Sequence, residues 1–183
     1  YAAYWNPAGF ARLKDKDIST TFIKYFEDVS YGYLGYSYPQ AGLGVFGVSI
    51  SYVAIRQIEK RTADTEFPDS KFSANDMCLA FSYALKEPFE DTLPGVDLGL
   101  NLKAISQKID DESAATAAVD LGAFYQTVLE PLTIGVVVQN IGPGQKFLEE
   151  RDPLPLNLKL SGAYRFLDET LIVGMDVDEY IID

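Results

Sequence analysis

Residues 74–140 alternate between apolar and polar side chains with a period of two, over a longer stretch than soluble proteins normally sustain. Between Met77 and Leu85 every odd position is Met, Leu, Phe or Tyr, and every even position is Cys, Ala or Ser. Successive side chains point to opposite faces of a β-strand, whereas the apolar face of a helix recurs every three or four residues. The pattern therefore predicts β-strands with one apolar face and one face of small or polar residues.

Similar alternation predicts about eight strands in the chain, at residues 31–38, 43–53, 77–85, 96–103, 116–126, 132–139, 156–165 and 171–178. Several of them are about ten residues long, which is more than the usual five or six. Long strands with one apolar face, separated by turns, are typical of transmembrane β-barrels. We therefore predict an all-β fold, a transmembrane antiparallel β-barrel whose apolar face meets lipid.

The predicted connections between the strands alternate between short turns and longer segments, namely residues 54–73, 106–114 and 141–155. Outer-membrane barrels have short periplasmic turns and longer outer loops, so this order gives each strand a direction. Tyr83, Tyr125 and Tyr164 then fall on the apolar face near the short turns. Aromatic residues at such a level form a girdle at the membrane interface, and we predict this role for the three tyrosines.

The opposite face of the strands carries the polar residues. The residues predicted to face the lumen are Asp76, Asp97, Asn101, Lys103, Asp120, Asn157, Lys159, Arg165 and Asp176. One interpretation is that these side chains select a solute. The other, which we favour, is that they pair across neighbouring strands and fill the interior.

The composition argues against several classes of function. The net charge of −12 opposes binding to nucleic acid, which requires a basic surface. The chain has no histidine and one cysteine, Cys78, so it lacks the commonest general base and metal ligand. An enzyme hypothesis would use paired carboxylates such as Asp97 and Asp120, but no base or nucleophile pattern accompanies them. We predict no enzyme activity, no cofactor and no metal site.

The first residues differ from the rest of the chain. They predict a short helix that breaks at Asn6 and Pro7, because the residue before a proline is pushed out of the helical region. The helical start does not have the alternation of a barrel strand, whereas residues 17–26 are ambiguous and could form a short strand. We assign residues 1–30 to a separate N-terminal segment and residues 31–183 to the strands of an incomplete barrel.

Five segments together resemble one protein family: AYWNPAG at residues 3–9, FSAND at 72–76, LGLNLK at 98–103, VQNIG at 138–142 and LPLNLKL at 154–160. They resemble the PorV/PorQ family of outer-membrane proteins, which is similar to the FadL transporters of long-chain fatty acids. The resemblance implies a FadL-like barrel of roughly fourteen strands, in which Asn6, Pro7 and Ala8 plug the lumen from the periplasmic side. This chain would supply its N-terminal portion, since it shows fewer strands and lacks the usual terminal aromatic residue.

The resemblance also implies where the protein works and with what. It implies an outer-membrane protein of a diderm bacterium that acts in type IX-like protein secretion or in transport, with outer-membrane lipid and secreted cargo or secretion-system proteins as partners. The alternative within the resemblance is a FadL-like channel for fatty acids or other hydrophobic molecules. An alternative of another class is a soluble all-β binding module whose apolar faces pack together as a sandwich.

Overall fold

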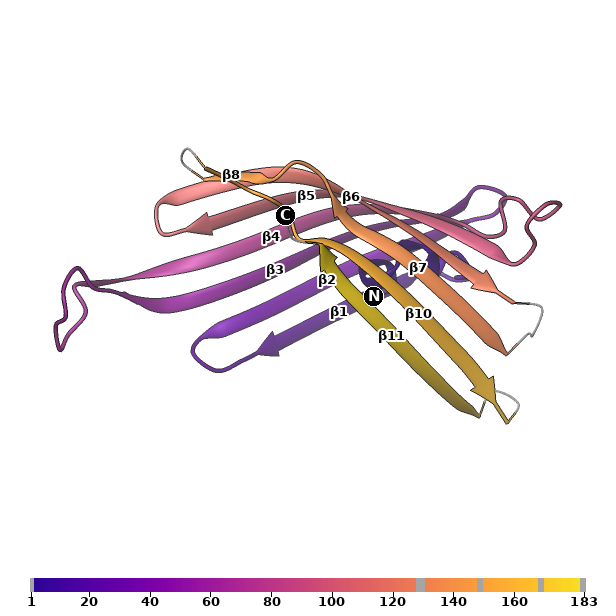
Figure 1. Ribbon diagram of the computed structural model, residues 1–183, viewed down its shortest axis with the longest axis horizontal. Helices are drawn as coiled ribbons and strands as arrows, with labels where there is room; N and C mark the ends of the chain where they lie inside the picture. The colour runs from indigo at the N-terminus through magenta and orange to yellow at the C-terminus, as the bar shows by residue number, and fades with distance from the viewer. Residues whose placement is uncertain (1, 128–130, 148–149, 168–169, 182–183) are drawn as a thin grey trace.

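The protein consists of one large antiparallel sheet and a short helical segment at its start (Figure 1). The structure is a computed structural model that describes residues 2–127, 131–147, 150–167 and 170–181. The helical segment comprises α1 (Ala2–Trp5) and η1 (Pro7–Phe10). The strands of the large sheet are β1 (Asp17–Lys24), β2 (Val29–Gln40), β3 (Gly44–Lys60), β4 (Ser70–Leu85), β5 (Val96–Ile109), β6 (Glu112–Gln126), β7 (Leu132–Ile141), β10 (Leu156–Phe166) and β11 (Leu171–Ile181).

The described residues form nine strands in the large sheet, in the order β1-β2-β3-β4-β5-β6-β7-β10-β11. A separate hairpin of β8 (Gln145–Phe147) and β9 (Glu150–Asp152) lies in the connection between β7 and β10. This arrangement confirms the predicted all-β antiparallel fold. A closed barrel is not formed by the described chain, because β1 pairs only with β2 and β11 pairs only with β10. The sheet instead curls partly round the helical segment (Figure 1).

The two faces of the sheet differ in character, and the apolar face is the exposed one. We call the face that contacts the helical segment the inner face, and the opposite one the outer face. On the outer face Phe81, Leu102 and Leu121 are 50%, 48% and 51% exposed. Within the described residues no second sheet covers them. The described residues therefore do not form a sandwich with packed apolar faces.

The helical segment packs on the inner face of the sheet. Phe10 and Ala11 contact Val45 of β3 and Ala84 of β4, and all four residues are buried. We call residues 2–13 the plug, because they occupy the space that the small inner side chains of the strands leave. No helix in the described part of the chain is long and apolar enough to span a membrane.

The sheet begins with a strand that the sequence leaves ambiguous. β1 starts at Asp17, inside residues 1–30, where the sequence leaves residues 17–26 as an ambiguous segment that could form a short strand. The strand is hard to recognise because Ile18 and Phe22 are the only large apolar residues of its outer face. The helical part of the N-terminal segment therefore ends at Phe10, before β1.

The strands also run further than the sequence predicts at one end of the sheet. β3 and β4 continue into residues 54–73, which leaves only residues 61–69 as a loop. The alternation is lost there because the register between the two strands shifts between Ile55 and Ile58. Residues 106–114 likewise continue β5 and β6 up to a tight turn. Connection lengths therefore do not alternate strictly between the two ends.

Candidate functional site

Asn6 joins the plug to the sheet. It caps η1, since its side-chain oxygen accepts a hydrogen bond from the Ala8 N–H at 3.0 Å, and Pro7 follows at a position that needs no N–H donor. The Nδ2 atom of Asn6 donates to the carbonyl oxygens of Val136 at 3.1 Å and Ala123 at 3.4 Å. The break at Asn6 is therefore both a helix start and an attachment to β6 and β7.

Two glycines, Gly99 of β5 and Gly122 of β6, let the plug approach the sheet closely. A Cβ atom on Gly99 would lie 2.1 Å from the backbone nitrogen of Ala8, and one on Gly122 would lie 2.1 Å from Oδ1 of Asn6. Only glycine fits at such distances unless the plug moves. We call these two residues the glycine niche. It holds the three residues predicted as the plug motif, Asn6, Pro7 and Ala8, all of them buried.

Asp120 is the centre of a hydrogen-bonded cluster on the inner face. The residue is 1% exposed, and its carboxylate accepts from Lys103 Nζ at 2.6 Å, Asn101 Nδ2 at 3.0 Å and the Asn140 backbone N–H at 2.9 Å. Asn101 also donates to the carbonyl oxygen of Ala3 in the plug at 2.9 Å. A buried carboxylate requires such partners in place of its lost hydration. We call Asn101, Lys103, Asp120 and Asn140 the Asp120 cluster.

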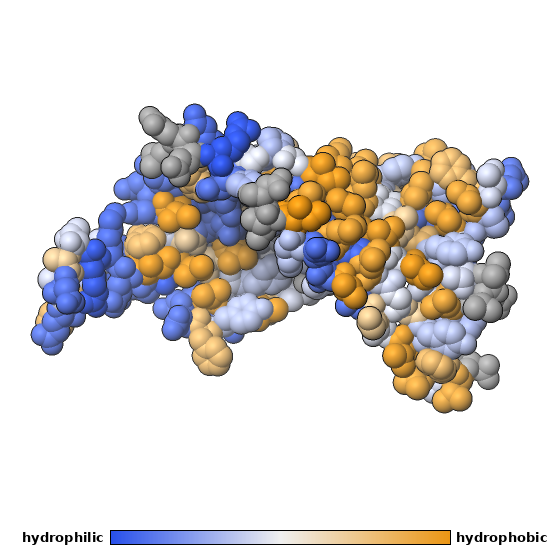
Figure 2. Space-filling model, in the orientation of Figure 1, coloured by the Kyte–Doolittle hydropathy of each residue, from blue (hydrophilic) through white to orange (hydrophobic). Residues whose placement is uncertain are grey.

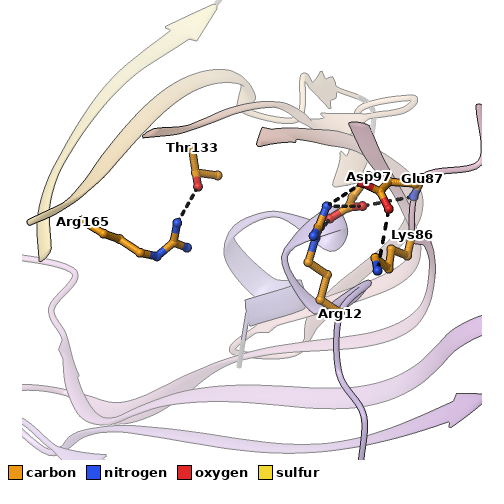
Figure 3. A network of polar contacts seen from close by, with 6 residues as sticks. All are labelled: Arg12, Lys86, Glu87, Asp97, Thr133 and Arg165. Carbon is orange, nitrogen blue, oxygen red and sulfur yellow. Dashed lines mark hydrogen bonds and ion pairs between the residues drawn. The ribbon is translucent and has the colours of Figure 1, made fainter. Parts of the chain in front are cut away.

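Asp97 pairs with the plug and not with a neighbouring strand (Figure 3). Its buried carboxylate accepts hydrogen bonds from the Arg12 guanidinium at 2.5 and 3.2 Å and from the backbone N–H of Glu87 at 3.1 Å. The hydrogen bond to Asp97 raises the pKa of Arg12 above its usual range. This charge-assisted pair holds the C-terminal end of the plug against β5.

The first turn of the plug is held by β7 and β10. Gln139 of β7 donates from Nε2 to the carbonyl oxygens of Tyr4 at 3.0 Å and Trp5 at 3.3 Å. Lys159 of β10 lies 5.3 Å from the centre of the Trp5 ring and forms an ion pair with Asp178 of β11 at 3.1 Å. Side chains from several strands thus fix the plug along its whole length.

The remaining residues predicted to face the lumen lie on the inner face but not in one site. Arg165 donates to Oγ1 of Thr133 at 3.1 Å, and Asn157 is buried. Asp76 and Asp176 form no ion pair with the residues that the structure describes. Of the predicted residues, only those of the Asp120 cluster share hydrogen bonds with one another in the described chain.

The three tyrosines predicted as a girdle lie on the outer face, near the ends of β4, β6 and β10. Tyr125 and Tyr164 are exposed. Tyr83 packs on Phe46 with ring centroids 4.9 Å apart and donates its hydroxyl to the carbonyl oxygen of Leu43 at 2.5 Å. Because β4, β6 and β10 are alternate strands of an antiparallel sheet, all three tyrosines lie toward the same end.

The plug borders a cavity of about 210 Å³ that Phe10, Leu13 and Tyr33 help to line, and it lies between two larger cavities on the inner face. One, of about 440 Å³, is lined by the Asp120 cluster. The other, of about 380 Å³, is lined by Arg12, Asp97 and Arg165, and by Gln126 and Thr133 where β6 ends and β7 begins. Trp5 lines both cavities.

Several residues of this site are absent from the sequence prediction. Arg12 lies outside any strand, where alternation gives no information about its direction. Gln139 lies on the polar face of the predicted strand 132–139 but is not among the residues predicted to face the lumen, and Asn140 follows that strand. The signal that would have indicated both is the segment VQNIG at residues 138–142, which is one of those that carry the family resemblance.

The chemistry available on the inner face is hydrogen bonding and ion pairing. Asp97 and Asp120, the carboxylates considered for an enzyme hypothesis, are held by different cations, Arg12 and Lys103. The described residues contain no group of three or more side chains placed to hold a metal ion. The arrangement can anchor a plug and can bind a ligand in either cavity.

Almost the whole chain matches one protein family. The family model described as type IX secretion system protein PorV matches residues 1–180. The match includes the plug, the glycine niche and the residues that line both cavities. A search of the curated proteins finds no match to the chain.

Gly99→Ala tests the docking of the plug. The added methyl group would overlap backbone atoms of Pro7 and Ala8, and we expect the variant to lose about 1–3 kcal/mol of stability. Gly162→Ala is the matched control, because a Cβ atom there meets nothing within 4 Å. Hydrogen exchange of residues 2–13 in detergent, measured by mass spectrometry, should accelerate only in the first variant. Equal exchange rates in the two variants would contradict the role of Gly99 in the docking of the plug.

Lys103→Met tests the Asp120 cluster. The substitution leaves a buried carboxylate without its cation, so the free energy of unfolding should fall by about 3–5 kcal/mol. In the control, Lys159→Met, the partner Asp178 has a side chain that is 39% exposed, and the loss should be about 1–2 kcal/mol at most. Urea unfolding in detergent micelles measures both. A similar loss of free energy of unfolding in the two variants would show that the burial of Asp120 does not set the cost of removing its lysine partner.

Proposed function

The chain belongs to the PorV family of type IX secretion system proteins, and we propose that it forms one wall of a FadL-like transmembrane β-barrel that assists protein secretion across the outer membrane of a diderm bacterium. Family membership implies a component of type IX secretion at the outer membrane. The proposal adds that the outer face of the sheet contacts lipid. It also adds that exposed loops bind secreted cargo or another protein of the secretion system.

The observation that carries the proposal is the exposed apolar outer face. Phe81, Leu102 and Leu121 come from three neighbouring strands and are each about half exposed. Large continuous apolar patches are rare on soluble monomers, whereas a bilayer accommodates them once the strand backbones are paired. The strands from β2 to β11 in the large sheet have 10 to 17 residues, and β1 has 8. A tilted transmembrane strand needs about 9–11 residues.

The two ends of the sheet differ in a way that fits the two sides of a membrane (Figure 2). The end that carries the β3–β4 hairpin is hydrophilic, and apolar residues cover much of the rest of the visible surface. Tyr83, Tyr125 and Tyr164 lie toward the opposite end, at a level where barrel aromatics meet lipid headgroups. The proposal therefore places the β3–β4 hairpin outside the cell and the turn after β2 in the periplasm.

The β3–β4 hairpin projects beyond the neighbouring strands (Figure 1) and is the surface that we assign to a protein partner. We call residues 61–69 the hairpin tip. Thr62 donates to the Asp69 carboxylate from its backbone N–H and from its hydroxyl, both at 2.7 Å, and these hydrogen bonds lower the pKa of Asp69. Phe67 is 74% exposed. An aromatic side chain on a preorganised loop binds a partner at a small entropy cost.

A FadL-like channel for fatty acids or other hydrophobic molecules is the alternative function. A solute that crosses the interior would have to pass the plug, to whose backbone Asn101 and Gln139 donate hydrogen bonds. It would also meet a polar inner face, with the Asp120 cluster beside the plug. These contacts favour secretion over the passage of hydrophobic molecules.

Leu102→Arg tests the contact of the outer face with lipid. Leu102 lies near the middle of β5, and an arginine near the bilayer midplane should cost about 2–4 kcal/mol. Ser51→Arg is the control, because Ser51 borders the cavity of about 440 Å³ on the inner face, and its cost should be clearly smaller. Refolding titrations into lipid vesicles measure both costs. Equal costs, or release of the protein from vesicles by carbonate, would contradict the proposal.

Phe67→Ser tests the hairpin tip as a docking site. We expect capture of a purified type IX cargo protein to weaken by roughly tenfold or more, as for the loss of an interface hot spot. Phe89→Ser is the control, because Phe89 is also exposed but lies in the connection after β4, at the opposite end of the sheet. Affinity is measured by surface binding of detergent-solubilised protein. Loss of cargo capture in both variants, or in neither, would contradict the assignment of the hairpin tip as a docking site.

A further inference from the structure

Arg165 is a cation on the inner face, and it differs from the other inner-face cations in its partners among the described residues. It reaches inward from β10 toward Thr133, apart from the contacts of Arg12 (Figure 3). No carboxylate of the described residues forms an ion pair with it, although the chain carries a net charge of −12. The other cations that line the two cavities, Arg12, Lys103 and Lys159, each pair with a carboxylate.

The side chain of Arg165 borders the cavity of about 380 Å³. Trp5, Phe124 and Ala163 contribute apolar surface to the same cavity. Small-molecule sites typically measure about 300–1,000 Å³ and combine apolar walls with a few polar groups. A guanidinium matches the geometry of a carboxylate, to which it donates two parallel hydrogen bonds. The cavity therefore offers one site for a negative charge next to an apolar surface.

We propose that this cavity binds a ligand that carries a carboxylate on an apolar group, and that Arg165 holds the carboxylate. Thr133 acts as a positioning residue, because its hydroxyl accepts a hydrogen bond from the Arg165 guanidinium at 3.1 Å. Arg12 is not the anion site, since its guanidinium is already bonded to Asp97. The C-terminus of a peptide that ends in an apolar residue and a fatty acid share this chemistry.

Trp5 makes the binding measurable, because it is the only tryptophan of the chain and lines the cavity. The full chain in detergent is titrated with N-acetyl-leucine and with octanoate while tryptophan emission is recorded. N-acetyl-leucinamide and octanamide are the neutral counterparts. We expect at least one acid to bind saturably, with its amide about tenfold or more weaker. Tighter binding of N-acetyl-leucine would identify the ligand as a peptide C-terminus, and tighter binding of octanoate would identify it as a fatty acid.

Variants of Arg165 test its role. Arg165→Gln should lower the affinity for the acid by roughly tenfold or more. Arg165→Lys keeps the charge without the planar fork, and its affinity for the acid should lie between that of Arg165→Gln and that of the parent protein. Arg56→Gln is the control, because Arg56 is exposed on β3 and lines neither cavity. Circular dichroism verifies that each variant is folded.

Three results would overturn the proposal: no saturable binding of either acid, amides that bind as tightly as the acids, or unchanged affinity in Arg165→Gln. If Arg165→Gln does not fold, Thr133→Val decides. This variant keeps the guanidinium but removes the oxygen that orients it. Weaker binding of the acid in Thr133→Val supports the proposal, and unchanged binding contradicts it.

Discussion

The close contact between the plug backbone and the sheet at Gly99 and Gly122 is the constraint on which the interior depends. Because no Cβ atom lies between them, Asn6 reaches the carbonyl oxygens of β6 and β7. The same approach brings the carbonyl oxygen of Ala3 within hydrogen-bond distance of Asn101. In small barrels the interior is filled by side chains of the strands. Here a segment of the chain does part of that filling, which requires small residues on the strands beneath it.

The interior is polar, and the two carboxylates that are buried in its described part, Asp97 and Asp120, are both paired. Lys103 and Asp120 come from the neighbouring strands β5 and β6 and bond across them, as expected for cross-strand pairs. Asp97 bonds instead to Arg12 of the plug. A buried charge without a partner is costly, so the plug and the strands depend on each other for their hydrogen bonds. The apolar residues that a soluble protein would bury lie on the outer face, and this reversal supports the assignment of that face to lipid.

Family membership and fold support each other at the level of particular residues. The match to the PorV family covers residues 1–180, and the segments that carry the resemblance contain Asn6, Gly99, Asn101 and Asn140. These residues dock the plug or belong to the Asp120 cluster. The resemblance therefore rests on residues with a structural reason to be there, and not only on the general pattern of strands.

The sequence by itself determined eight of the nine strands of the large sheet, their two faces and the break at Asn6, because successive side chains of a strand point to opposite faces. It left β1 ambiguous and did not predict β8 and β9. It failed where that local rule is interrupted, at the register shift between Ile55 and Ile58. Only the tertiary structure decided which inner residues meet, such as Arg12 with Asp97. It also decided that the described sheet stays open and that the plug lies between two cavities. Such contacts depend on strand register and on the curvature of the whole sheet, which no alternation along a single strand encodes.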